Sequence, residues 1–391
     1  MRIPRIRWLL LLTLLLAATV AAGCGDDDSS SSSESGIKQS KSASERQEAA
    51  AAGKKMGQEE GDPVALEKQK VGLLLVVPSE IVLRSEAAVK DAAKELGWSV
   101  QTCDAQGVAA KFTSCAETLL NGGATVMVSV ATESAPMKAQ MERAKKEGIP
   151  WINTTGLVTP TDLFSTQITE RELELASVLT DYVIEKMNGK GTLAYSTLPS
   201  LYAIKIRVDK LLSELEAKAP GITPIPVEAD LADILGRTRQ QANALLTRYP
   251  NLGGFWTTTD PTQLAFAATV QAKRPGSQYP ERPLIAAAYG TLVNLAAIRK
   301  GSIDAVAEMA VESTSWMALD MAAEHFARDK PFPPDSDAVE EQYPIPFLET
   351  TLITKENVPK DPKAYYPPEH DFVSFFKAKW DQEFPADERS K

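Results

Sequence analysis

Residues that could perform covalent or metal chemistry are rare in this chain of 391 residues, which contains three cysteines and two histidines. His325 and His370 are too few for a histidine-rich metal site, and they leave little room for a Ser-His-Asp triad. The sequence has no GxSxG, Walker A, GxGxxG or HExxH motif and no metal-spaced cluster of cysteine and histidine. We therefore expect no enzymatic activity, no cofactor and no metal.

The first cysteine, Cys24, ends a segment typical of protein export. Arginines occupy positions 2, 5 and 7, residues 8–20 are almost wholly apolar, and residues 21–23 are small. The apolar run is shorter than the roughly 20 residues that a spanning helix needs. The small-small-Gly-Cys ending resembles the lipobox of bacterial lipoproteins, which implies a signal peptide over 1–23 and a lipid on Cys24. The alternative is an ordinary secretory signal followed by an incidental cysteine.

The composition of residues 24–69 predicts a tether. Three aspartates and five serines open the segment, which has no aromatic residue and few large aliphatic ones. Such a composition cannot bury a core. We expect a disordered spacer that holds the folded body near the outer face of the cytoplasmic membrane.

The remaining cysteines, Cys103 and Cys115, lie close together in the sequence of the folded body. In an exported protein two such cysteines usually pair. A loop this short would contribute about 3 kcal/mol if the bond is unstrained. We predict a disulfide, and the alternative is a pair of buried free thiols.

From residue 70 onwards, short apolar runs alternate with helical stripes. The run 71–77, ended by Pro78, suits a strand buried on both faces of a parallel sheet. Two successive α/β sets of similar size imply an α/β fold with two doubly wound parallel-sheet lobes. The predicted strands are 71–77, 98–102, 125–130 and 149–153 in the first set, then 191–196, 222–227, 253–257, 284–288 and 303–309, with a further strand-like piece at 347–354.

Several phrases in this order resemble type I periplasmic binding proteins of the ribose-binding-like branch, over about residues 70–355. They are the opening strand 71–78, ELGW at 95–98, AKKEGIP at 144–150, YPNLGGF at 249–255, Thr259-Asp260, and AAYG at 287–290. The resemblance implies two lobes joined by three chain crossings, with a ligand cleft between them that closes by hinge motion. It places the N-terminal lobe at 70–168 plus 309–341, and the C-terminal lobe at 169–308 plus 342–380.

The resemblance also implies that loops following the strands line the ligand site. The Asp-Arg and Gly-Phe-Asp anchors of many sugar binders are missing, and the acidic side chains would suit a ligand with an amine or many hydroxyl groups. Asp260 could instead be a helix N-cap, and Arg207 could be a solvated helix residue. The candidate ligand-binding residues are Ser79, Glu80, Glu133, Thr155, Tyr202, Arg207, Thr259, Asp260, Tyr289 and Glu308.

Together these features predict a monomeric, lipid-anchored solute-binding protein that delivers a small sugar-like or amine-bearing ligand to the permease subunits of an ABC importer. A ligand-sensing lipoprotein that signals to a membrane receptor is the alternative. A net charge of −10 and a pI near 5.0 argue against nucleic acid as a partner.

Overall fold

A computed structural model describes residues 41–230, 232–385 and 389. The predicted signal peptide, Cys24 and the start of the predicted tether lie outside the described residues. Within the described part of the chain, no helix has the length and apolar character needed to cross a membrane.

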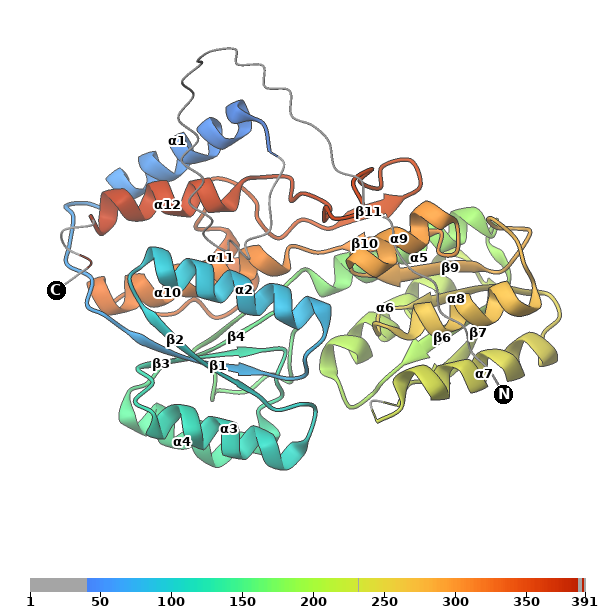
Figure 1. Ribbon diagram of the computed structural model, residues 1–391, viewed down its shortest axis with the longest axis horizontal. Helices are drawn as coiled ribbons and strands as arrows, with labels where there is room; N and C mark the ends of the chain where they lie inside the picture. The colour runs from blue at the N-terminus through green and yellow to red at the C-terminus, as the bar shows by residue number, and fades with distance from the viewer. Residues whose placement is uncertain (1–40, 231, 386–388, 390–391) are drawn as a thin grey trace, which may run out of the picture. The chain divides into compact units, whose positions relative to one another are not determined.

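The first lobe is built on a five-stranded parallel sheet in the order β2-β1-β3-β4-β5. Helices α2 and α10 lie on one side of this sheet, and α3 and α4 lie on the other (Figure 1). The strands are β1 (Lys70–Leu75), β2 (Ser99–Asp104), β3 (Val126–Val130), β4 (Trp151–Thr154) and β5 (Thr166–Ile168). The helices are α2 (Glu80–Glu95), α3 (Ala109–Asn121), α4 (Lys138–Glu147, after the short turn η1 at Ala135–Met137) and α10 (Val311–Arg328).

The second lobe has a six-stranded sheet in the order β11-β10-β9-β8-β6-β7, in which only the β10–β11 pair is antiparallel. Its strands are β6 (Lys190–Thr197), β7 (Gly221–Glu228), β8 (Leu252–Thr257), β9 (Leu284–Ala288), β10 (Ala305–Glu308) and β11 (Thr351–Thr354). Its helices are α5 (Glu172–Lys186), α6 (Tyr202–Lys218), α7 (Ile234–Arg248), α8 (Thr262–Lys273) and α9 (Leu292–Lys300). The predicted α/β class with two parallel-sheet lobes is confirmed.

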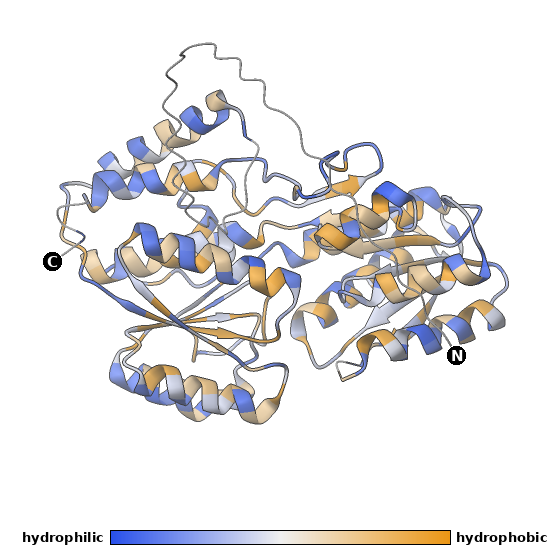
Figure 2. Ribbon diagram, viewed as in Figure 1, coloured by the Kyte–Doolittle hydropathy of each residue, from blue (hydrophilic) through white to orange (hydrophobic). Residues whose placement is uncertain are grey.

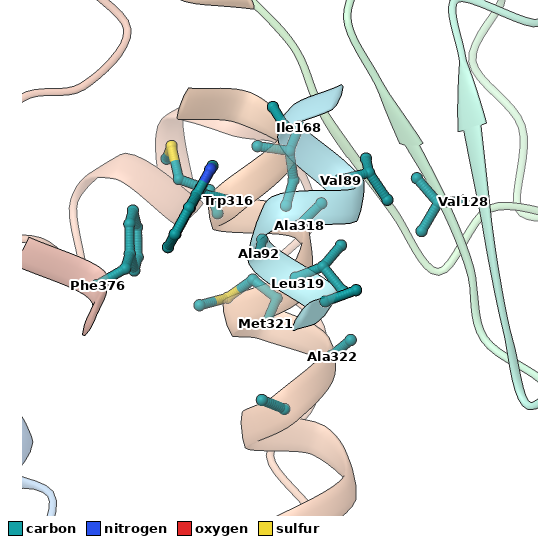
Figure 3. Packing of buried hydrophobic residues seen from close by; sticks show 14 of the residues in the cluster. Val89, Ala92, Val128, Ile168, Trp316, Ala318, Leu319, Met321, Ala322 and Phe376 are labelled. Carbon is teal, nitrogen blue, oxygen red and sulfur yellow. The ribbon is translucent and has the colours of Figure 1, made fainter. Parts of the chain in front are cut away.

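The prediction placed residues 342–380 in the second lobe, but only part of this segment lies there. After α11 (Ser336–Glu340), strand β11 pairs with the second sheet, but α12 (Phe372–Glu383) packs into the core of the first lobe. Phe372, Phe376 and Trp380 lie on one face of α12 and surround Trp316 of α10. Figure 3 shows Phe376 beside Trp316, with Val89 of α2 and Val128 of β3 further into the same core. This aromatic face explains why the tail returns to the first lobe.

The predicted tether also differs from the structure, because residues 43–59 form helix α1 (Ala43–Glu59). A capping box between Ser42 and Glu45 starts the helix. Gly53 and Gly57 let α1 approach α12 so closely that a Cβ on Gly53 would lie 2.1 Å from the Phe375 carbonyl oxygen. In Figure 2, α1 alternates hydrophilic stretches with weakly hydrophobic ones. The buried residues of the contact face, Ala49, Gly53 and Gly57, are all small, so composition alone suggested disorder.

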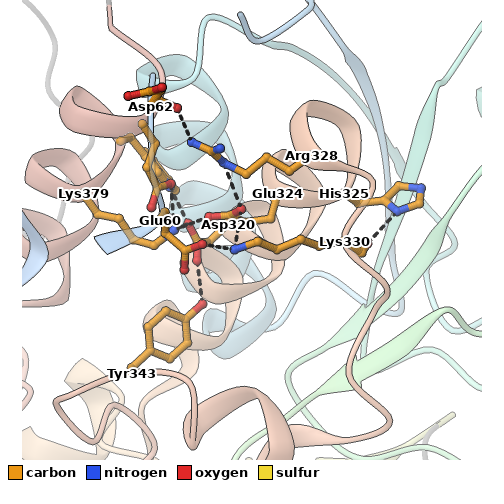
Figure 4. A network of polar contacts seen from close by, with 11 residues as sticks. Glu60, Asp62, Asp320, Glu324, His325, Arg328, Lys330, Tyr343 and Lys379 are labelled. Carbon is orange, nitrogen blue, oxygen red and sulfur yellow. Dashed lines mark hydrogen bonds and ion pairs between the residues drawn. The ribbon is translucent and has the colours of Figure 1, made fainter. Parts of the chain in front are cut away.

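A buried polar network also holds α12 against α10 (Figure 4). Lys379 is 1% exposed, and its ammonium donates to Asp320 at 2.8 Å, Glu324 at 2.7 Å and Glu383 at 2.9 Å. Tyr343 also donates to Asp320, at 2.7 Å. Three carboxylates thus share one buried ammonium, which makes the network depend on Lys379.

The predicted disulfide is confirmed. Cys103 of β2 and Cys115 of α3 are bonded, with their Cα atoms 5.5 Å apart. The bond ties the helix to the edge strand of the first sheet.

Candidate functional site

The candidate site lies where the loops after the strands of both sheets meet. Three of these loops contain a non-glycine residue in the left-handed region: Ala131 after β3, Thr155 after β4 and Tyr289 after β9. Such backbone costs of order 1–3 kcal/mol per residue and is concentrated at functional sites. The strained loops therefore mark the same edge that ligands use in parallel α/β sheets.

Arg207 and Tyr289, both predicted from the sequence, come together at the centre of this region. Arg207 of α6 is fully buried and pairs with the carboxylate of Glu172. It also donates to the Tyr289 hydroxyl at 3.1 Å and to the Thr258 carbonyl at 3.4 Å. The alternative of a solvated helix residue is therefore wrong for Arg207.

Two acids that the sequence analysis missed, Glu170 and Glu172, complete this centre. The Glu172 carboxylate also accepts from the Leu157 amide at 2.7 Å, and Glu170 accepts from the Gly156 amide at 2.7 Å. Glu170 is 3% exposed, and its second oxygen, Oε1, has no hydrogen-bond partner among the described residues. Burial and the neighbouring Glu172 raise the pKa of Glu170 to about 7. The only sequence signal was their position after β5, a strand of three residues with no apolar run.

Three of the predicted residues follow β1 or β3 and make polar contacts with backbone amides. Glu80 accepts from the Leu292 amide at 2.7 Å, so α2 of the first lobe contacts the start of α9 in the second. Glu133 accepts from the amides of Tyr202 at 3.3 Å and Thr159 at 3.1 Å. Ser79 caps α2. Glu80 and Glu133 thus link the two lobes directly, and Tyr202 is drawn into this contact through its backbone.

Glu308, at the end of β10, has both carboxylate oxygens engaged. One accepts from Arg84 at 2.6 Å, and the other accepts from the Gly290 amide. Arg84, on α2, is paired with Glu312 as well. Glu308 therefore connects α2 to the loop after β9, and its oxygens are not free for a ligand. Arg84 lies within α2, and no sequence pattern indicated it.

The site also contains uncharged hydroxyl groups, most of them from threonines. Thr155 lies 2.6 Å from the Ser85 hydroxyl. The hydroxyls of Thr258 and Thr259, after β8, and of Ser196 at the end of β6 are buried and have no hydrogen-bond partner among the described residues. A buried hydroxyl without a partner costs about 1–3 kcal/mol. Each of these hydroxyls can donate one hydrogen bond and accept others.

Asp260 is partly buried and follows these threonines in the chain. It accepts from the side-chain amides of Gln263 and, at 3.3 Å, Asn294, while helix α8 begins after Pro261 with no side-chain cap. The N-cap alternative for Asp260 is therefore wrong. Burial raises the pKa of Asp260.

Residues 78–330 match the family model described as the periplasmic binding protein domain. The chain belongs to this family. No curated protein sequence matches the chain.

Solved structures share the fold of this periplasmic binding protein at low sequence identity. An ABC sugar transporter subunit from Rhodobacter sphaeroides has a TM-score of 0.63 at 19% identity, covering 74% of this chain and 99% of the other. An ABC transporter solute-binding protein from Agrobacterium vitis with bound allitol has a TM-score of 0.65 at 17% identity, covering 75% and 98%. The fructose-binding periplasmic domain of a hybrid two-component system has a TM-score of 0.63 at 17% identity, covering 74% and 92%.

Proposed function

We propose that this periplasmic binding protein captures a small polar ligand between its lobes and delivers it to an ABC importer, without making or breaking a bond. The observation that carries the proposal is the set of buried oxygens at the strand ends that lack hydrogen-bond partners among the described residues. They belong to Glu170, which lies in the segment between the two sheets, and to Ser196, Thr258 and Thr259 at the strand ends of the second sheet. A ligand rich in hydroxyl groups would satisfy all of them at once.

The charge of the centre favours a ligand with hydrogen-bond donors. The guanidinium of Arg207 is paired with Glu172, so its charge is already offset. One carboxylate oxygen of Glu170 has no partner among the described residues, and in the ionised form it accepts hydrogen bonds but cannot donate them. A polyol, a sugar or an amine-bearing sugar fits this pattern, whereas an acidic sugar does not. The allitol bound to the protein from Agrobacterium vitis supports the polyol class.

Capture would proceed by hinge motion of the two lobes around the ligand. We assign residues 70–168 and 309–341 to the N-terminal lobe and residues 169–308 to the C-terminal lobe, with β11 in the second and α12 in the first. The contacts of Glu80 and Glu133 with amides of the other lobe would then stabilise the closed form that a permease binds.

Membrane attachment completes the proposal. A lipid on Cys24, followed by a spacer as far as α1, would keep the monomer at the outer face of the cytoplasmic membrane, where a permease can receive the ligand. Mass spectrometry of the membrane-extracted protein tests this step. A diacylglyceryl-modified Cys24 at the N-terminus is expected, and an unmodified Cys24 would exclude the anchor.

A sensing role is the second candidate, because the fructose-binding domain of a two-component system shares this fold. Deleting the chain's gene separates the two roles. Loss of ligand uptake supports transport, whereas unchanged uptake with lost ligand-dependent transcription supports sensing.

The binding proposal is tested by isothermal titration calorimetry against polyols, neutral sugars and amino sugars. We expect one ligand per chain and at least tenfold weaker binding by Glu170→Gln, which removes the free carboxylate but keeps the shape of the side chain. Glu174→Gln, on a half-exposed neighbour in α5, is the matched control and should bind normally. Equal affinities of the two variants would contradict the role of Glu170.

A further inference from the structure

A second group of polar side chains lies beside the segments that flank β11. Glu349 precedes β11, and Glu369 and His370 follow it on the way to α12. Each of the three offers a ligand atom, and these atoms lie within 4.8 Å of one another. The His370 Nε2 atom is 4.0 Å from a carboxylate oxygen of Glu349. Residues far apart along the tail therefore present two oxygens and one imidazole nitrogen to one point.

These side chains line a small cavity of about 30 Å³. Arg84, Glu308 and Glu312 line the same cavity, so it holds four carboxylates against one guanidinium. That guanidinium is already paired with Glu308 and Glu312. Glu349 and Glu369 consequently have no cation within salt-bridge distance among the described residues, other than His370 beside Glu349.

Two unpartnered atoms indicate that the cavity takes a ligand. The Oε2 atom of Glu349 is buried without a hydrogen-bond partner in the described part of the chain. The Nη1 atom of Arg84, whose side chain is 5% exposed, likewise has none there. A cation bound to Glu349 would satisfy the first atom, and an oxygen ligand of that cation could accept from the second. One hydrated ion therefore explains an unpaired acceptor and an unpaired donor together.

The ligand atoms of Glu349, Glu369 and His370 determine which kind of metal ion fits. Imidazole nitrogen combined with carboxylate oxygen suits Zn²⁺ and related transition metals better than Ca²⁺ or Mg²⁺, which prefer oxygen alone. Bonds of about 2.0–2.1 Å place neighbouring ligand atoms of a tetrahedral zinc ion roughly 3.4 Å apart. Glu349 and His370 are about one-third exposed, so small side-chain rotations can bring their ligand atoms to that spacing.

We propose that Glu349, Glu369 and His370 form a binding site for one divalent transition-metal ion of the Zn²⁺ type, with a fourth position open to water. The ion would clamp the segment entering β11 to the segment leaving it. Because these segments join the sheet of the second lobe to the core of the first, a bound ion would stiffen their connection.

The test uses the full chain with Cys24→Ser, purified without a histidine tag and treated with chelator, so that no thiol competes for zinc. The chain has two histidines, which makes imidazole NMR signals a direct readout. We expect one equivalent of ZnCl₂ to shift the His370 signal and leave that of His325 unchanged. We also expect calorimetry to show at least tenfold weaker zinc binding by His370→Ala and by Glu349→Gln.

His325→Ala is the matched control, since His325 lies on α10 and bonds the Lys330 carbonyl. It should keep the zinc affinity of the parent chain. Zinc binding that survives His370→Ala, or the absence of zinc binding in the parent chain, would overturn the proposal. Polyol binding is measured separately, so failure of the metal site leaves the proposed function untouched, and the reverse also holds.

Discussion

Removing the ammonium of Lys379 should destabilise the first lobe more than any surface change on the same helix. The substitution Lys379→Met keeps the length and apolar stem of the side chain but leaves Asp320, Glu324 and Glu383 without their shared cation. All three carboxylates are less than 5% exposed. Breaking a buried ion pair by removing one partner typically costs 3–5 kcal/mol. We expect a loss of about that size at pH 7.

Urea titration followed by tryptophan fluorescence measures this loss, because the rings of Trp316 and Trp380 stack 5.3 Å apart beside the network. Lys377→Met is the matched control. Lys377 lies on the same helix, is 47% exposed and pairs with Glu95, so its removal should cost less than about 1 kcal/mol. Equal stabilities of the two single variants would refute the reasoning.

Three further predictions concern pH and packing. Burial raises the pKa of Glu383 to about 9, above its ordinary value of 4.5, so the stability it contributes is complete below pH 4.5 and is lost as the pH rises towards 9. Glu383→Gln should flatten this decline in urea titrations at pH 6 and pH 9, and an unchanged slope would contradict it. The pKa of Glu170 is about 7, so its ionised fraction and the binding of an amine-bearing ligand should be about fivefold greater at pH 7 than at pH 6, whereas Glu170→Gln should abolish the difference in calorimetry. Gly53→Leu should detach α1 from α12, which faster amide hydrogen exchange over residues 43–59 would reveal; protection equal to the parent would show that the glycine contact is dispensable.

The strands of both lobes other than β5 could be predicted because most of them are short apolar runs, as in 71–77 and 284–288. Helix α1 could not, because its contact with α12 uses small residues such as Gly53 instead of an apolar stripe. The placement of α12 depends on contacts with Trp316, which lies more than fifty residues earlier in the chain.

The residues of the site could be predicted only in part, because some of them lie outside any recognisable sequence pattern. The resemblance to type I periplasmic binding proteins led to Tyr289, at a strand end, and to Arg207, on a helix, and the structure brings the two together. Glu170 escaped notice because β5 is too short to have a pattern. The partners that occupy both oxygens of Glu308 come from α2 and from the loop after β9, and no local pattern indicates them.

The central claim is that buried, unpaired oxygens at the strand ends hold a polar ligand. Its most direct test is calorimetric titration of the parent chain and of Thr259→Val with the tightest-binding polyol or amino sugar from a thermal-shift screen. Thr259→Val removes one unpaired hydroxyl at nearly constant volume. We predict one-to-one binding by the parent chain and roughly 5–10-fold weaker binding by the variant, as expected for the loss of one hydrogen bond. Equal affinity of Thr259→Val and the parent, or no binding of any polyol or sugar by the parent, would contradict the account.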